Sequence, residues 1–226
     1  MASEVDICNL ALGHLGDNAT VASIDPPEGS AQAEHCARFY PIARDTLLEL
    51  HTWNFASRRA QLAQVTMPWP EWRYAYALPA NTINVMAVMP PQANNDYSES
   101  AYSGSGFGTT SWDRRPPAAG MYVPQAYSCE TDATGNQVIY TNQEDAVLRY
   151  TVRVEDPTHF SPLFVQCLSW HLASMLAGPV VKGDAGAAES KRCAAMMSAW
   201  LGKAVESDAN QRKADVEHIV NWMAGR

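Results

Sequence analysis

Basic residues are scarce in this chain. It has 226 residues, with 16 Lys and Arg against 24 Asp and Glu, a formal net charge of -8 and a pI near 5.2. A protein that binds nucleic acid tightly and without sequence preference needs a basic face that neutralises phosphates. The charge balance opposes that function, although it allows a surface past which DNA slides. Only 18% of the residues are charged, against a usual value of about 25%, which suits a chain that buries surface against neighbours.

Closely spaced cysteines are also lacking. The number is odd and no pair has Cys-x-x-Cys spacing, which opposes a disulfide framework or a zinc site. Two His–Cys neighbourhoods, His35 with Cys36 and Cys167 with His171, offer too few ligands for a metal. We expect buried free thiols in a reducing cytosol, with neither metal nor cofactor. The five cysteines are Cys8, Cys36, Cys129, Cys167 and Cys193.

Catalytic motifs are missing as well. The chain contains no Walker A loop, no Gly-x-Ser-x-Gly and no His-Glu-x-x-His. The glycine-rich stretch 104–108 lacks the spacing of a phosphate loop, and the acidic pairs 144–145 and 155–156 are typical of solvated turns. The sequence offers no recognisable set of a nucleophile, a general base and oxyanion donors that would come together in one site. We therefore predict a protein that is not an enzyme. A cytosolic enzyme that uses His171 or the scattered carboxylates is the alternative.

One long uncharged run, residues 163–181, is almost long enough to cross a bilayer. It contains polar residues and ends at Gly178-Pro179, so we predict a buried helix and no membrane partner. The N-terminus is acidic and lacks the basic region of a signal peptide. The polar residues in the run are Gln166, Ser169, His171 and Ser174.

Helical periodicity marks both ends of the chain. Ser3 is expected to cap a first helix that stops at Gly16, and Ser30 a second that Pro41 kinks or divides. In the last third, Ser161 caps a helix to about Ala177. A final helix starts near 184 and breaks near 207–208. The predicted buried faces are Val5, Cys8, Leu12 and Leu15; then Ala33, Cys36, Ala37, Tyr40, Ala43, Leu47 and Leu50; then Cys193, Met196, Met197, Trp200, Leu201 and Ala204.

The middle of the chain changes to strand-like patterns. Strands are expected at 60–65, 73–78, 83–89, 122–129, 137–141 and 146–154. Residues 92–120 are rich in Asn, Ser, Gly and Tyr and predict a flexible loop. Trp69, Trp72, Tyr74 and Tyr76 form an aromatic cluster that we assign to sheet packing rather than to stacking on nucleic acid.

This order of elements predicts an α+β fold. We expect a mainly helical body of about four helices, made by residues 1–57 and 158–226, with an inserted antiparallel β lobe at 58–157 that contains the loop.

Several N-terminal segments resemble a known family. The motifs are Asn9-x-x-Leu12-Gly13-x-Leu15-Gly16, Val21-Ala22-Ser23-Ile24-Asp25, Tyr40-Pro41-x-Ala43-Arg44-Asp45-x-Leu47-Leu48 and Trp53-Asn54-Phe55-Ala56 followed by arginine. With these motifs the chain resembles phage head-to-tail adaptors of the tail tubular protein A type, and the resemblance covers residues 4–65 best.

The resemblance implies a structural virion protein of the tail or neck, made in the host cytoplasm. Such subunits form a homo-oligomeric ring, commonly a dodecamer, through heterologous contacts that close. The ring connects the portal protein to the tail nozzle or tube, and DNA passes through its lumen without specific binding. A head-completion or tail-completion protein of another tail type is the closest alternative.

Three groups of residues are candidates for these contacts. We expect Arg44, Asp45, Arg58 and Arg59 at subunit interfaces. An amphipathic tail is expected to dock on the portal, so that deleting 208–226 spares the fold, and the flexible loop is expected to face the tail. The tail residues are Val216, Ile219, Val220, Trp222 and Met223, and the loop residues are Tyr97, Tyr102, Phe107 and Trp112.

Overall fold

The computed structural model describes residues 2–18, 20–66, 69–91, 125–132 and 134–211. These residues contain four α-helices and seven strands in two antiparallel sheets, which confirms the predicted α+β class with its helical body. The chain divides into two compact units. Met1–Ala56 and Arg153–Arg212 make the first, and Ser57–Val152 lies in the second.

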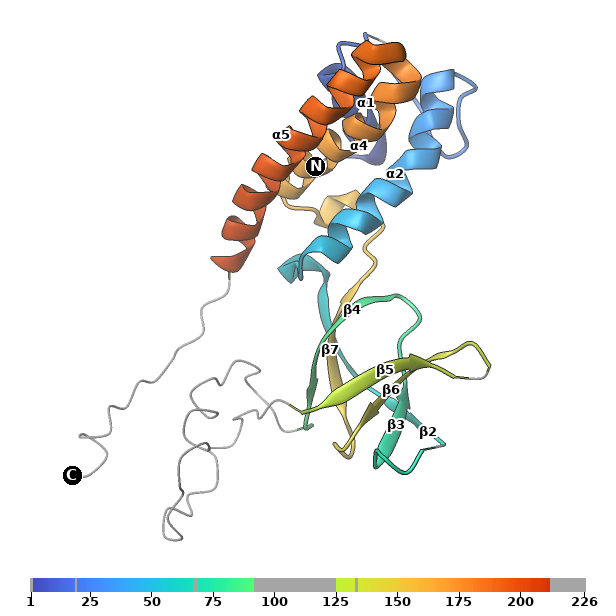
Figure 1. The fold of residues 1–226 in the computed structure, drawn as a ribbon, viewed down its shortest axis with the longest axis vertical. Helices are drawn as coiled ribbons and strands as arrows, with labels where there is room; N and C mark the ends of the chain where they lie inside the picture. The colour runs from blue at the N-terminus through green and yellow to red at the C-terminus, as the bar shows by residue number, and fades with distance from the viewer. Residues whose placement is uncertain (1, 19, 67–68, 92–124, 133, 212–226) are drawn as a thin grey trace, which may run out of the picture. The chain divides into compact units, whose positions relative to one another are not determined.

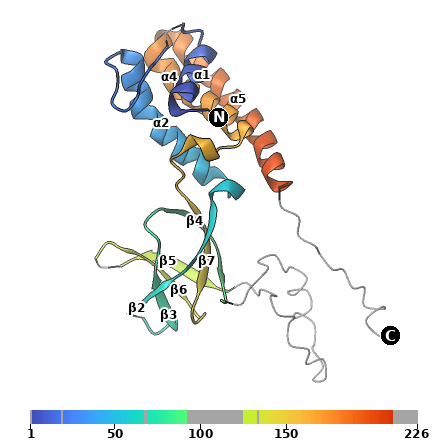
Figure 2. The same cartoon turned by 180° about the vertical axis from the view of Figure 1, so that it is seen from behind.

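The first unit is a bundle of helices (Figures 1 and 2). Helix α4 contacts each of the other three, so it is the central element of the bundle. It is also the one helix of the described residues that is long and apolar enough to cross a membrane, and 44% of its apolar window is buried within the protein. The helices are α1 (Glu4–His14), α2 (Ala31–Leu50), α4 (Pro162–Val181) and α5 (Gly183–Ala209).

Three serines begin three of these helices, as predicted. Ser3 forms a complete capping box with Asp6, and Ser30 and Ser161 accept hydrogen bonds from the backbones of Ala33 and Phe164. The buried face of α1 differs from the predicted one. Of the predicted residues Cys8 and Leu12 are buried, whereas Val5 and Leu15 are not, and Ile7 and Ala11 take their place.

Prolines interrupt these helices less than expected. Pro41 lies inside α2, which continues as one helix to Leu50, and Pro179 lies inside α4, which continues past the predicted stop to Val181. Leu50, predicted to be buried, is 55% exposed because it belongs to the last turn of α2. The break predicted near 207–208 lies within two residues of the observed end of α5 at Ala209.

A tight reversal joins α4 to α5. Lys182 and Gly183 both have positive φ, 62° and 60°, which turns the chain back without a loop. Three residues later, a Cβ on Gly186 would lie 2.9 Å from the carbonyl oxygen of Ala177. Glycine is therefore required where α5 meets α4, because any larger residue would collide with backbone.

The second unit consists of two sheets, ordered β1-β7-β4 and β2-β3-β6-β5. The predicted strand 60–65 is divided, because buried Leu62 separates β1 from β2 and its N–H donates to Ala146 O. The two halves enter different sheets. The strands are β1 (Ser57–Gln61), β2 (Ala63–Val65), β3 (Tyr74–Ala77), β4 (Thr82–Met89), β5 (Tyr127–Thr131), β6 (Gln137–Thr141) and β7 (Val147–Val152).

The aromatic residues of this unit have different environments. Trp72 packs against a small core of Ala75, Val138 and Tyr140. Tyr76 is buried and its hydroxyl donates to Gln143 O at 2.9 Å. Trp69 is 57% exposed, so it does not pack in that core, although it was predicted to pack on the sheet with the other aromatic residues.

Candidate functional site

The predicted interface residues Arg44 and Asp45 form an ion pair within the helical unit. Arg44 Nε lies 2.8 Å from Asp45 Oδ1, and Arg153 Nε lies 3.1 Å from Asp45 Oδ2. The side chain of Arg44 is only 8% exposed, whereas that of Arg153 is 52% exposed. Arg44 is thus largely buried within its own unit, and Arg153 is the more accessible of the two arginines that contact Asp45. A role for Arg44 and Asp45 between subunits stays a prediction.

The second predicted pair, Arg58 and Arg59, lies on strand β1 of the other unit. Both residues are exposed, and their partners across the ladder are Tyr150 and Arg149. Neighbouring residues of a strand point to opposite faces. The two guanidinium groups therefore present charge on both sides of the sheet rather than forming one basic spot, and their interface role also stays a prediction.

The other predicted contact residues lie outside the described residues. They are the loop residues Tyr97, Tyr102, Phe107 and Trp112, and the tail residues Val216, Ile219, Val220, Trp222 and Met223.

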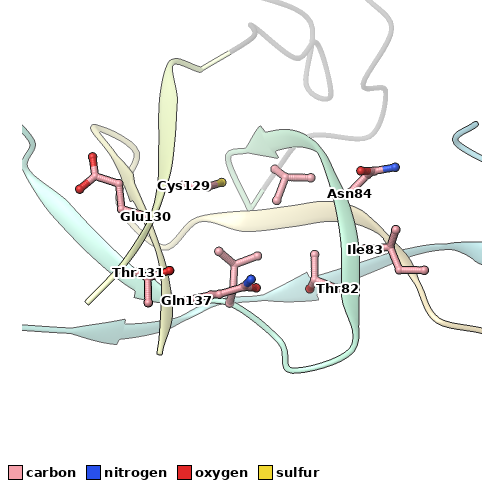
Figure 3. Close-up of a pocket in the computed structure, with 9 residues that line it drawn as sticks. Thr82, Ile83, Asn84, Cys129, Glu130, Thr131 and Gln137 are labelled. Atoms are coloured by element: carbon pink, nitrogen blue, oxygen red, sulfur yellow. The ribbon is translucent and has the colours of Figure 1, made fainter. Parts of the chain in front are cut away.

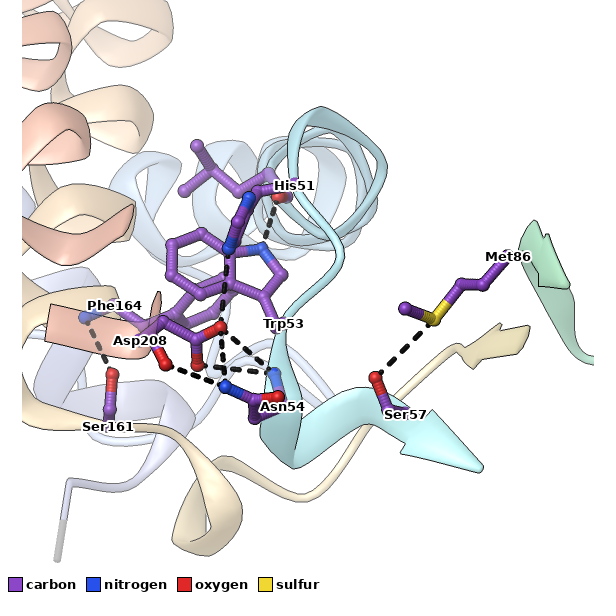
Figure 4. Close-up of polar contacts among 9 residues, drawn as sticks. His51, Trp53, Asn54, Ser57, Met86, Ser161, Phe164 and Asp208 are labelled. Atoms are coloured by element: carbon purple, nitrogen blue, oxygen red, sulfur yellow. Dashed lines mark hydrogen bonds and ion pairs between the residues drawn. The ribbon is translucent and has the colours of Figure 1, made fainter. Parts of the chain in front are cut away.

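The Trp53-Asn54-Phe55 segment forms a corner that ends the first helical segment (Figure 4). Trp53 is fully buried, its Nε1 donates to Leu47 O at 2.8 Å, and its ring meets that of Phe164 edge-on at 5.0 Å. Phe55 also contacts Phe164, with ring centroids 5.1 Å apart. The aromatic part of the motif is therefore a packing element of the helical unit.

Asp208, near the end of α5, holds this corner in place. Its carboxylate accepts the backbone N–H of Asn54 at 3.1 Å to each oxygen, and His51 Nε2 lies 3.2 Å from Oδ2. The Asn54 side-chain amide donates to Asp208 O at 2.6 Å and to Oδ2 at 3.1 Å. Sequence reasoning missed this role, because the only signal was an acid late in an amphipathic pattern, more than 150 residues from its partners.

A second cluster of reactive groups lies where α1 faces α2. Glu4 and Cys8 are four residues apart on α1, and Cys36, Tyr40 and Arg44 repeat that spacing on α2. Both thiols and the Tyr40 side chain are buried. The neighbouring Cys36 thiol, and then burial, raise the pKa of Cys8, whereas the Cys8 thiol lowers the pKa of Cys36 against the effect of burial. Burial also raises the pKa of Tyr40.

Helix α4 carries a stacked group on its α1 side. The rings of His14 and Trp170 stack at 3.6 Å, with only 4° between their planes. Arg192 of α5 lies over Trp170 at 5.5 Å and donates to His14 O at 2.8 Å. Burial, and then the charge of Arg192, lower the pKa of His14. The stack joins three helices, and both effects disfavour the charged form of the imidazole.

The second His–Cys neighbourhood, Cys167 with His171, lies on α4. Cys167 donates its thiol to Met197 O at 3.6 Å, and burial raises its pKa to about 12. Neither ring nitrogen of His171 has a hydrogen-bond partner among the residues that the structure describes, and burial lowers its pKa. Within those residues, no three His, Cys, Asp or Glu side chains gather as ligands.

A groove of about 250 Å³ lies in the second unit, between β4 and β5 (Figure 3). Tyr127 OH donates to Val85 O at 3.4 Å and connects the two strands. The lining mixes aliphatic, hydroxyl and amide side chains with one carboxylate and one thiol. Its residues are Leu78, Thr82, Ile83, Asn84, Val85, Cys129, Glu130, Thr131 and Gln137.

No known family model matches this chain, and no curated protein matches it either. What the resemblance of residues 4–65 to head-to-tail adaptors implies about function is therefore a proposal.

Proposed function

We propose that this protein is a ring-forming structural subunit that joins a viral portal to a tail. The observation that carries the proposal is where the resembling residues lie in the fold. The Tyr40–Ala56 stretch makes the second half of α2 and the Trp53 corner, and the β unit begins at the next residue. A helical body with an inserted β unit is the architecture that the resemblance implies.

Exposed apolar side chains on the helical unit support subunit contacts. Ile42 and Leu50 of α2 are 53% and 55% exposed, and Leu10 of α1 is 43% exposed. Burial of such side chains against another copy would contribute about 25 cal/mol for each Å² removed from water. We propose that this part of α2 contacts the neighbouring subunit in the ring. The net charge of -8 is consistent with a lumen to which DNA does not adhere.

Residues 212–226 are the part of the chain that we propose docks on the portal. A deletion from 208 would also remove Asp208, which holds Asn54, so a shorter deletion tests docking without disturbing this contact. Deleting 212–226 keeps that contact. We expect this shorter variant to retain the helix content and melting temperature of the full chain and to lose capture by immobilised portal rings of the same virus.

A matched variant pair separates docking from ring formation. Ile42→Glu places a charge on the proposed subunit contact, and Ala31→Glu places the same charge at an exposed position of the same helix. We expect the first to lower the number of copies on each portal and the second to leave it unchanged. Full capture of the 212–226 deletion by the portal would contradict the proposed docking role.

A further inference from the structure

The groove between β4 and β5 lies where the two sheets of the second unit each end in an edge strand. Strand β4 is an edge of the sheet β1-β7-β4, and β5 is an edge of the sheet β2-β3-β6-β5. Within the residues that the structure describes, neither strand has a further strand beside it on its outer side. The labelled side chains of β4 and β5 lie on opposite sides of the groove (Figure 3). An edge strand presents unpaired N–H and C=O groups to which another chain can bond.

Both strands border the groove with these edges. Successive residues line it, namely 82–85 of β4 and 129–131 of β5, whereas the face of a strand would contribute only every second residue. The outward groups of β5 follow from its hairpin with β6. Asp132 N donates to Asn136 O, so by alternation Cys129 and Thr131 direct their N–H and C=O groups away from β6.

The two edges do not pair with each other. The hydroxyl of Tyr127, at the start of β5, lies 3.4 Å from Val85 O on β4. A tyrosine side chain together with such a hydrogen bond is longer than the spacing of about 4.8 Å between paired strands. At this end of the groove β4 and β5 are therefore too far apart to form a ladder, and the open edge of β5 is available to an extended segment.

The charge of the lining indicates what this segment carries. Glu130 is exposed, and it is the one charged residue among those that line the groove. A residue of an added strand that lies directly opposite Glu130 shares its face of the sheet, and an opposite charge there is favourable. The chain itself has 16 Lys and Arg against 24 Asp and Glu, so a basic segment is more readily supplied by a different protein.

We propose that the groove between β4 and β5 binds an extended segment of a different protein, which adds as a strand to the open edge of β5 and places a lysine or arginine opposite Glu130. In strand addition the backbone hydrogen bonds supply affinity and the side chains at alternate positions supply specificity. Leu78, Ile83 and Val85 offer aliphatic surface to those side chains. This binding site belongs to the second unit alone and does not depend on the proposed assembly.

Cys129 provides the readout, because it lines the groove and is exposed, whereas the other four cysteines are buried. We would select binders of the native full chain from a displayed library of short random peptides, synthesise them, and measure how each one slows the alkylation of Cys129 by a maleimide. We expect the selected peptides to combine lysine or arginine with β-branched residues and to protect Cys129.

Strand addition also predicts a period of two along the bound peptide. Methylation of a peptide nitrogen that pairs with β5 should weaken binding about tenfold, whereas methylation of the next nitrogen should have a much smaller effect. Glu130→Lys should change the preference from basic to acidic peptides. The matched control Glu144→Lys, at another exposed position of the same unit, should leave the preference unchanged.

Three results would overturn the proposal. The first is a selection in which no peptide protects Cys129, and the second is equal sensitivity to methylation at every peptide nitrogen. The third is protection of Cys129 in the chain alone. Protection that grows with the concentration of the chain would assign the groove to a second copy, and protection at every concentration would assign it to a segment of the same chain.

Discussion

Replacing Asp208 with alanine removes the group that fixes the Trp53 corner to the end of α5. The side chain of Asp208 is 7% exposed, and its carboxylate accepts hydrogen bonds from the backbone and side chain of Asn54 and lies against His51. A hydrogen bond to a charged group contributes about 1.5–3 kcal/mol. These bonds share one carboxylate and are not additive, so we expect a total loss of about 2–4 kcal/mol.

The loss is measurable as a fall in melting temperature of roughly 5–12 °C for a chain of this size. Urea unfolding followed by tryptophan fluorescence gives a second measurement, because buried Trp53 lies in the corner itself. Asp208→Asn keeps one carbonyl oxygen for the Asn54 N–H but loses the charge, so we expect about half of the effect. The Asn54 amide also retains its bond to the backbone oxygen of Asp208.

The matched control for this substitution is Glu206→Ala, which removes an exposed carboxylate from the same end of α5. Surface changes of this kind usually alter stability by less than about 0.5 kcal/mol. If Asp208→Ala were as stable as the control, the corner would not depend on Asp208, and the reasoning from its hydrogen bonds would be refuted.

Two further pairs of variants test the packing of α4. Gly186→Ala should destabilise the helical unit, because the new Cβ would lie 2.9 Å from Ala177 O. Gly202→Ala places its Cβ in open space and should stabilise α5 by about 0.5–1 kcal/mol. Equal melting temperatures of the two variants would contradict this expectation. Burial lowers the pKa of His171, so the unfolded chain binds its proton more readily, and stability is lost as the pH falls below about 6.5. His171→Leu should therefore lose less stability between pH 7 and pH 5 than wild type or the exposed control His159→Leu, and an unchanged pH profile would show that His171 does not contribute.

Local signals in the sequence predicted where elements begin better than where they end. Ser3, Ser30 and Ser161 mark helix starts because a capping side chain acts within three residues of its own position. Pro179 did not end α4, which runs on to Val181 where Gly186 of α5 packs against Ala177 and Gly178, a tertiary contact that no local signal shows. Strand 60–65 divides at Leu62 for a similar reason, since its partner Ala146 lies far along the chain.

The candidate sites depend even more on contacts between residues far apart in the sequence, which local patterns do not show. The Trp53-Asn54 motif was visible in the sequence, but its partner Asp208 was not, because no local pattern connects two residues on separate elements. Arg58 and Arg59 were predicted together at a subunit interface, and their side chains point to opposite faces of the sheet because they are neighbours on one strand.

The proposed role as a ring subunit is tested most directly by the mass of the assembled particle. We would measure the purified full chain by mass photometry, alone and mixed with portal rings of the same virus. The proposed role predicts either a closed ring of the chain itself or a fixed number of copies added to each portal. A protein that stays monomeric and leaves the mass of the portal unchanged would contradict it.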